Sequence, residues 1–242
     1  MILSTLPTPL IELRQATKTY DSGVPVHALH RTDLIIHHGD SVAIVGPSGS
    51  GKSTLLNVLG LLDAPTTGTY LLEGVDVTAS DEVVRGAVRG QKFGFVFQSF
   101  HLLSNRTVTE NVELAMMYAQ VPRSQRRPRA HAVLETLGLI HRRDADPRDL
   151  SGGERQRAAI ARAICLSPRV LFCDEPTGNL DSRNTGIVME SLASLTQAGL
   201  TLVMVTHNPE LARTMNRTIS VQDGATAETP CASNGQGTLS NV

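Results

Sequence analysis

The chain has 242 residues, of which 40% are apolar, and its formal net charge is −1. A chain of this size can bury a sizeable core, and its balanced charge gives no overall attraction to nucleic acid or anionic lipid, so no nucleic-acid partner is expected. No apolar run reaches the roughly 18 to 20 residues that span a bilayer, and the first residues lack the basic and then apolar segments of a signal peptide. We therefore expect a cytosolic protein that reaches a membrane only through a partner.

The predicted elements begin with short alternating segments and turns over residues 10–36 and 68–77, which indicate a small antiparallel sheet. Ser41–Val45 is predicted as a strand that leads into a glycine-rich loop. Three later runs are apolar throughout and alternate with helical patterns, the first of which is the helix Lys52–Leu59. Continuous apolar strands separated by helices indicate a parallel sheet covered on both faces. The four predicted strands are Ser41–Val45, Phe93–Phe97, 170–173 and 202–205.

Two segments depart from this alternation of strands and helices. Val108–Tyr118 and residues 130–137 both have helical patterns with no strand between them, which predicts a helical insertion over about residues 99–153. From Ala225 onward the chain loses its periodicity and fills with small polar residues, so we predict a disordered tail over 225–242.

The three cysteines, Cys165, Cys173 and Cys231, stand far apart and show no metal-ligand spacing. An odd count without a disulfide framework suits a reducing compartment. We expect the first two to be buried as small apolar side chains.

The most specific motif is GPSGSGKST, which follows a predicted strand, opens a helix and fits the P-loop pattern. Its glycines let backbone N–H groups surround a polyphosphate at the positive end of the helix. Lys52 then supplies a cation for the β- and γ-phosphates, and the Ser53 hydroxyl is the expected Mg²⁺ ligand; the competing interpretation is an ordinary glycine- and serine-rich turn. The predicted nucleotide-binding residues here are Gly46, Pro47, Ser48, Gly49, Ser50, Gly51, Lys52, Ser53 and Thr54.

Two carboxylates and a histidine follow buried strands. Asp174 and Glu175 come directly after residues 170–173, and we expect Asp174 to orient Mg²⁺ and Glu175 to polarise the attacking water as general base. His207 closes the strand LVMVTH and could hydrogen-bond the γ-phosphate. The alternatives are a solvated acidic pair and a polar residue satisfied at a strand end.

A second surface for anions is predicted where LSGGERQR opens an amphipathic helix. Ser151 is a good N-cap, and two glycines expose N–H groups at the positive helix end. One nucleotide scarcely needs two such surfaces, so we expect this one to complete the site of another copy. The residues expected to bind nucleotide there are Ser151, Gly152, Gly153 and Glu154.

LSGGERQR resembles the ABC signature sequence, and together with GPSGSGKST and VLFCDEPTGNLD it makes the chain similar to ABC-transporter nucleotide-binding subunits over roughly residues 10–223. The resemblance implies an α/β fold: a P-loop NTPase core with a parallel sheet, a small N-terminal antiparallel β subdomain and an inserted helical subdomain, all within residues 1–224. It also implies an ATPase that uses ATP and Mg²⁺ and forms a head-to-tail dimer. Each ATP would then lie between one P-loop and Ser151–Glu154 of the opposing copy.

The resemblance assigns roles to further residues. Tyr20 matches the aromatic residue that stacks on adenine, although it could instead be a core-strand residue. Gln98 matches the Q-loop residue, which touches Mg²⁺ and links the core to the helical insertion, and residues 178–181 match the D-loop. His207 matches the switch histidine.

Several stretches resemble the ATPases of lipoprotein-release and macrolide-export systems. In that subfamily the segment Gln98–Leu103 receives a membrane permease, and Phe97 and Phe100 are expected to be exposed there, unless they pack within the loop. The implied function is ATP-driven export or mechanotransmission at the cytoplasmic face of the inner membrane. The alternatives are the ATPase of a non-transporting regulator of a cell-wall partner and, less favoured, a soluble ABC protein of DNA repair or translation.

A run of arginines lies in the predicted helical insertion, in the sequence RSQRRPR over 123–129. A solvated helix face explains such a run. Contact with anionic lipid or an acidic partner loop is the alternative.

Overall fold

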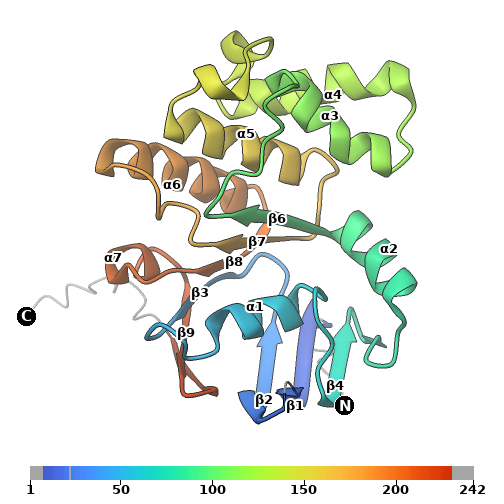
Figure 1. Ribbon diagram of the computed structural model, residues 1–242, viewed down its shortest axis with the longest axis vertical. Coiled ribbons are helices and arrows are strands. Elements are labelled where there is room, and N and C mark those ends of the chain that lie inside the picture. The colour runs from blue at the N-terminus through green and yellow to red at the C-terminus, as the bar shows by residue number, and fades with distance from the viewer. Residues whose placement is uncertain (1–7, 22, 231–242) are drawn as a thin grey trace, which may run out of the picture.

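The structure, a computed structural model, describes residues 8–21 and 23–230, which form two sheets with helices around them (Figure 1). The strands are β1 (Ile11–Asp21), β2 (Pro25–Ile36), β3 (Ser41–Val45), β4 (Thr67–Leu72), β5 (Val75–Asp76), β6 (Phe93–Phe97), β7 (Val170–Asp174), β8 (Thr201–Val205), β9 (Arg217–Gln222) and β10 (Ala225–Pro230). The helices are α1 (Lys52–Leu59), α2 (Glu82–Lys92), α3 (Val108–Tyr118), α4 (Arg123–Thr136), α5 (Gly152–Ile164), α6 (Ser182–Gln197) and α7 (Pro209–Ala212), with short 3₁₀ turns η1 (Ile140–Arg142) and η2 (Pro147–Asp149).

The predicted sheets are both present. The smaller one has the order β2-β1-β4-β5, and all its pairings are antiparallel. The larger one has the order β10-β9-β3-β8-β7-β6, and β9, β3, β8, β7 and β6 run parallel. The four runs are strands as predicted, except that β7 extends to Asp174 and β8 begins at Thr201.

The parallel strands are apolar on both faces because each face covers a different core. Phe172 and Val203 belong to the core that α1 and the small sheet complete, whereas Leu171 and Met204 belong to the core under α3, α5 and α6. Figure 1 shows α1 between the two sheets and the other three helices beyond the far side of the larger sheet. The two cysteines that were expected to be buried, Cys165 and Cys173, lie in the second core.

Between β6 and β7 the chain forms helices and turns. The helix predicted over Val108–Tyr118 has those bounds. Helix α4 begins at Arg123 rather than at residue 130, because arginine favours helix and Pro128 does not prevent it. Most of the arginine run is exposed and Arg126 is half-buried, as a solvated helix face requires.

The prediction of a disordered tail from Ala225 is wrong for its first six residues. Ala225–Pro230 form β10, which pairs antiparallel with β9 through a turn at Asp223 and Gly224. Asp-Gly between two extended runs is a strong hairpin signal, and it outweighs the polar composition. Residues 231–242 lie outside the described residues.

None of the helices within residues 8–21 and 23–230 combines the length and the apolar character needed to cross a membrane.

Candidate nucleotide site

The P-loop motif connects β3 to α1, as its sequence predicts. Gly51 is the N-cap of α1 at φ 106°, and no side chain caps the helix there, so no capping side chain competes with a ligand for its first N–H groups. A Cβ on Gly46 would lie 2.0 Å from the backbone oxygen of Val221, and one on Gly51 would lie 2.4 Å from that of Ala28. Glycine is therefore required at both positions for the loop to pack this closely.

Two polar side chains of the loop are available to a phosphate. Lys52 Nζ lies across the loop and donates to the backbone oxygens of Gly46 at 3.0 Å and Pro47 at 2.7 Å. The Ser50 hydroxyl is buried and has no hydrogen-bond partner among the described residues. An anion in the loop would satisfy the hydroxyl and give the ammonium a charged partner.

A cavity of about 420 Å³ opens beside the loop, between Ser53 and Thr54 on one side and strand β2 on the other. His27 and Asp223 also line it, and neither was singled out from the sequence. The Asp223-Gly224 turn reaches the loop because the N–H of Gly224 donates to the backbone oxygen of Ser50 at 2.9 Å. The hairpin signal of that dipeptide could have indicated the turn, but not its contact with the P-loop.

Asp174 and Glu175 emerge where β7 ends. Asp174 is half-buried, and its pKa is raised by burial and by the neighbouring Glu175, while Lys52 opposes the rise. Lys52 is thus close enough to affect the pKa of Asp174. This electrostatic interaction connects the P-loop with the acidic pair. Glu175 has φ 49°, a left-handed backbone that turns its side chain away from the strand direction.

His207 lies two residues after β8 and contacts Glu175, with 2.8 Å between Nδ1 and Oε2. It also lines a cavity of about 410 Å³ together with Gly46, the first residue of the P-loop. The structure therefore brings the P-loop, the acidic pair and His207 to one edge of the sheet, as the strand-end positions predict.

Tyr20 lies near the end of β1 and is 37% exposed, so it is a strand residue but not a core residue. The Lys18 ammonium lies 4.9 Å from the centre of its ring, and the same ammonium bonds to Asp63 at 2.6 Å. Burial, assisted by hydrogen bonding to Asp63, raises the pKa of Tyr20, and a hydrogen bond with Thr54 opposes this. The ring thus lies beside the start of α1.

Gln98 directly follows β6 and contacts Asn179, which lies in the turn after β7. Asn179 was not predicted as a site residue except as part of the 178–181 segment. No spacing rule could have paired two residues 81 positions apart.

Ser151 is the N-cap of α5, as predicted. Its Oγ accepts from the N–H of Glu154 at 3.3 Å, and its own N–H donates to the Glu154 carboxylate at 2.8 Å, which makes a capping box. Residues 151–154 are not among those that line the cavity beside the P-loop of the same chain. The two predicted anion-binding surfaces are therefore separate within one copy.

The expectation that Phe97 and Phe100 are exposed is wrong, because both are half-buried. The Phe97 ring stacks near Phe95, with centroids 6.2 Å apart, and meets His101 edge-on at 5.5 Å. The guanidinium of Arg155 lies 5.8 Å from the Phe100 ring. Packing against β6, the following loop and α5 therefore accounts for much of their apolar surface.

Known proteins resemble this chain over nearly all the described residues. The macrolide export ATP-binding/permease protein MacB of Rhodospirillum rubrum is 47% identical over 227 residues, which cover 93% of this chain and 35% of that protein. The ABC transporter ATP-binding protein YknY of Bacillus subtilis is 45% identical over 216 residues, which cover 89% of this chain and 94% of that protein. The chain thus spans about a third of the length of the MacB protein.

A solved structure has the same fold. The ATP-binding cassette MJ0796, seen as a dimer in a post-hydrolysis state with ADP and Pi, matches with a TM-score of 0.83 and 38% identity. The match covers 92% of this chain and 99% of that one. The family model for ABC transporters matches residues 29–178, more than half of the chain. With its P-loop, acidic strand end and signature helix in place, the chain belongs to the ABC transporter family, as an ATP-hydrolysing nucleotide-binding domain.

Proposed function

We propose that two copies of the chain enclose ATP and Mg²⁺ head to tail and drive a separate membrane permease, in an export or mechanotransmission complex. The observation that carries this proposal is the separation of the two anion-binding surfaces. The P-loop lies at the start of α1, between the two sheets, and Ser151 lies at the start of α5, on the far side of the larger sheet. A second copy is needed to bring Ser151 to the nucleotide of the first.

The dimeric MJ0796 cassette supports this proposal, because that protein binds ADP and Pi as a dimer. The fixed capping box also supports it. The reciprocal bonds between Ser151 and Glu154 form the N-terminus of α5 without any nucleotide bound. A preformed surface of this kind loses little entropy when the partner's nucleotide docks on it.

The residues proposed to hold Mg²⁺ fit that ion. Ser53 offers a hydroxyl, Gln98 an amide oxygen and Asp174 a carboxylate, and oxygen ligands together with phosphates are what Mg²⁺ prefers. Ser53 and Gln98 are exposed, and Asp174 is half-buried at the end of β7. Bound Mg²⁺ would neutralise charge on the phosphates.

The remaining roles belong to side chains of this chain. Lys52 is proposed to bind the β- and γ-phosphates, exchanging its two carbonyl contacts for phosphate oxygens. Glu175 is proposed to accept a proton from the attacking water. His207, in contact with Glu175, is proposed to bind the γ-phosphate, and Tyr20 to stack on adenine.

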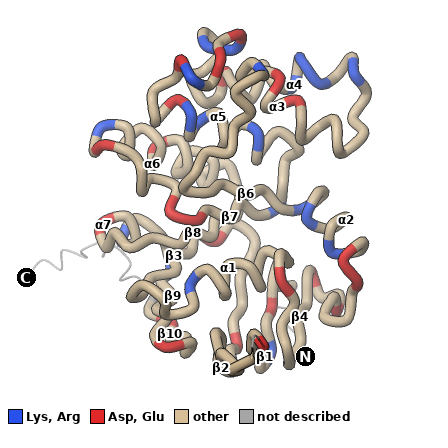
Figure 2. The backbone as a smooth tube through the Cα atoms, viewed as in Figure 1, with Lys and Arg blue, Asp and Glu red and all other residues tan. Residues whose placement is uncertain are grey.

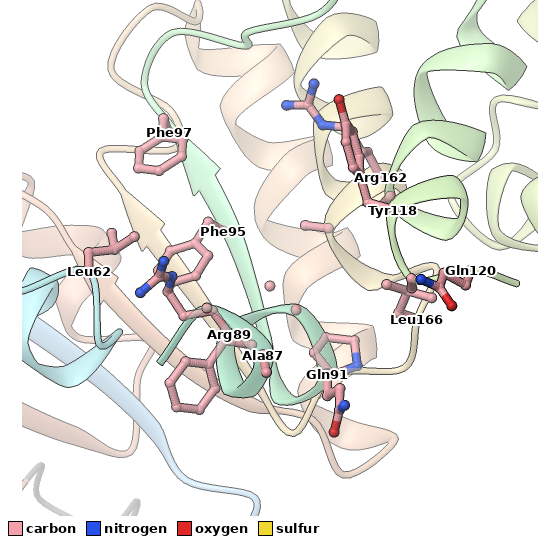
Figure 3. A pocket seen from close by; sticks show the side chains of 18 residues that line it. Leu62, Ala87, Arg89, Gln91, Phe95, Phe97, Tyr118, Gln120, Arg162 and Leu166 are labelled. Atoms are coloured by element: carbon pink, nitrogen blue, oxygen red, sulfur yellow. The ribbon is translucent and has the colours of Figure 1, made fainter. Parts of the chain in front are cut away.

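A cavity of about 800 Å³ supports a permease contact next to Gln98–Leu103. It lies between α2, β6 and the ends of α3 and α5, and Figure 3 shows Phe95, Tyr118 and Arg162 around it. Tyr118 is 82% exposed at its rim, which is unusual for so large an apolar ring. We propose that a short amphipathic helix of the permease inserts here.

The charge around this cavity agrees with such an occupant. Arg89 and Arg162 line it, and Figure 2 shows further Lys and Arg along α2 and around α4. Acidic side chains beside the apolar face of the permease helix would complement them. With this contact we propose that the chain lies at the cytoplasmic face of the membrane.

The head-to-tail arrangement is tested by mixing two inactive variants. Ser151→Arg spoils the surface given to the partner, and Lys52→Ala spoils the chain's own P-loop. In a mixed dimer, the P-loop of the Ser151→Arg chain meets the intact Ser151 of the other chain, which rebuilds one complete site. ATP hydrolysis should therefore reappear on mixing. Activity in either variant alone, or none in the mixture of folded chains, would contradict the arrangement.

The permease contact is tested by recovery of the chain with membranes. Tyr118→Glu places a charge at the cavity and should prevent co-purification of a permease, while hydrolysis by the purified chain stays normal. Val75→Glu is the matched control, since Val75 is 64% exposed on β5 and does not line the cavity. Equal recovery of the permease with both variants would place the contact elsewhere.

A further inference from the structure

Two loops that follow neighbouring strands are joined by a reciprocal pair of hydrogen bonds. Gln98 follows β6, and its Nε2 donates to Asn179 Oδ1 at 3.3 Å. Asn179 lies in the turn between β7 and α6, and its Nδ2 donates to the backbone oxygen of Gln98 at 3.1 Å. The side chain of Asn179 thus contacts both the backbone and the side chain of Gln98.

This pair fixes the orientation of both amides. A backbone oxygen can only accept, so the Asn179 group that faces it must be Nδ2. Asn179 then presents Oδ1 to the Gln98 side chain, and an oxygen that accepts requires the Gln98 group there to be Nε2. As a consequence, Oε1 of Gln98 is directed away from Asn179.

The turn that carries Asn179 is itself held in place. The N–H of Gly178 donates to the backbone oxygen of Glu175 at 3.1 Å, and that of Leu180 to the oxygen of Thr177 at 3.1 Å. Asp181 caps α6 immediately afterwards. A Cβ on Gly178 would lie 2.8 Å from Gln98 Nε2, so the backbone packs directly against the Gln98 side chain. Asn179 is therefore positioned by the same turn that begins at Glu175.

The other contacts of this segment act on its backbone. Gln156 Nε2 donates to the oxygen of Phe97 at 3.4 Å, and Arg162 donates to those of Phe100 at 3.1 Å and His101 at 2.6 Å. Both donors come from α5, and they set the path of the chain on either side of Gln98. Among the described contacts, Asn179 is the residue that bonds to the Gln98 amide itself.

We infer that Asn179 is a positioning residue that holds Gln98 with its Oε1 free to ligate Mg²⁺. The inference rests on the proposed role of Gln98 as a metal ligand. Residues that hydrogen-bond a metal ligand orient it, and their loss typically weakens metal binding about 10- to 100-fold. Without Asn179, the Gln98 amide can rotate and offer Nε2, which cannot bind a cation.

The test measures metal affinity separately from turnover. Mg²⁺ is titrated calorimetrically into the purified chain saturated with a non-hydrolysable ATP analogue, and binding of the analogue is measured again without metal. Asn179→Ala should weaken Mg²⁺ binding about 10-fold and leave binding of the metal-free analogue unchanged. The exposed Asn105, which lies later in the same segment, provides Asn105→Ala as a control that should resemble the wild type.

A double variant separates positioning from a general effect on the fold. If Asn179 acts through Gln98, then Gln98→Ala with Asn179→Ala should bind Mg²⁺ as weakly as Gln98→Ala alone. Additive losses would show that Asn179 acts by another route and would overturn the inference. If Asn179→Ala does not fold, Asn179→Leu serves in its place, because it keeps roughly the size of the side chain but can neither donate nor accept a hydrogen bond.

The outcomes distinguish the inference from the proposed function. Weak Mg²⁺ binding in Gln98→Ala but normal binding in Asn179→Ala overturns the inference and leaves the metal role of Gln98 standing. Normal binding in both variants overturns the metal role of Gln98 and the inference with it.

Discussion

The Glu175 carboxylate and the His207 imidazole are in direct contact, with 2.8 Å between Oε2 and Nδ1. An ionised carboxylate only accepts hydrogen bonds, so Nδ1 carries the proton in this contact. The Glu175 side chain is 19% exposed and that of His207 is 72% exposed, so the histidine is the member of the pair with room to move. The residue proposed as general base and the residue proposed to bind the γ-phosphate therefore share one hydrogen bond.

The first prediction concerns the proposed general base. Glu175→Gln should leave ATP binding intact and slow hydrolysis by about 10²- to 10⁴-fold, because the amide cannot accept a proton from water. It should also accumulate a dimer with ATP bound, measured by size-exclusion chromatography with light scattering, while phosphate release reports the rate.

Glu210→Gln is the control for this variant. Glu210 is exposed at the same edge of the sheet as Glu175, and both residues line one surface cavity there. It should hydrolyse ATP at the normal rate. Wild-type turnover in Glu175→Gln would show that another group is the base.

The second prediction concerns Tyr20, which is proposed to stack on adenine. The chain contains no tryptophan, so Tyr20→Trp gives a single tryptophan at the predicted base site, whose fluorescence can be excited selectively. Its emission should change when ATP binds, with affinity close to that of the wild type. Tyr20→Ala should lose about 1 to 3 kcal/mol of binding free energy, the usual value of stacking on one base. Unchanged affinity in Tyr20→Ala would contradict the assignment.

The third prediction uses Glu73, in the turn between β4 and β5. Its hydrogen bond with Lys92, at the end of α2, lowers the pKa of the carboxyl from the ordinary 4.5, with burial opposing and Arg169 assisting. A carboxyl whose pKa is lower in the folded state stabilises that state above its unfolded pKa, and the gain disappears as the pH falls through the folded pKa.

Glu73→Gln should therefore lower the free energy of unfolding near neutral pH, by no more than about 1 kcal/mol because the pair is partly exposed. The difference from wild type should close as the solution is acidified below the ordinary pKa of 4.5. Urea unfolding at several pH values measures this. A difference that persists at acid pH would assign the effect to packing rather than to charge.

The fourth prediction concerns the thiols. Burial raises the pKa of Cys165 to about 11 and that of Cys173 still further. Since the thiolate is the reactive form, neither residue should be alkylated by iodoacetamide in the folded protein at mildly alkaline pH. Both should react in denaturant, as mass spectrometry of their peptides would show. Rapid labelling of Cys173 in the native protein would mean that the sheet opens locally.

Much of the fold could be predicted from the sequence because the responsible signals are local. The strands around Ala43 and Phe172 are apolar at four of their five residues, as expected of strands that are buried on both faces. The glycines at 46 and 51 are needed where backbone approaches backbone, which is why their motif is so specific. Ser151 could be recognised as an N-cap because Glu154 stands three residues later.

The features that were not predicted depend on contacts between distant segments, or lie in segments whose composition gives little strand signal. The pairing of Gln98 with Asn179 arises because β6 and β7 are adjacent, and sequence spacing does not report adjacency. Strand β10 was not predicted, because its segment is rich in small polar residues, although the Asp-Gly turn before it is a hairpin signal. The half-burial of Phe97 and Phe100 follows from neighbours such as His101 in the loop and Arg155 on α5, which come together only in the folded protein.

The register of the parallel strands has a mechanical consequence. Phe97 pairs with Asp174, and Asp174 pairs with Val205, so three strands finish level with one another. Neighbouring strands lie about 4.8 Å apart. The residues just beyond these three ends are those proposed to lie next to the permease contact, to activate the water and to bind the γ-phosphate. A displacement of β6, the outermost of these strands, would have to cross at most two strand spacings to reach the residues beyond β7 and β8. The proposed permease contact and the proposed hydrolysis can therefore be coupled without a long chain of intermediate contacts.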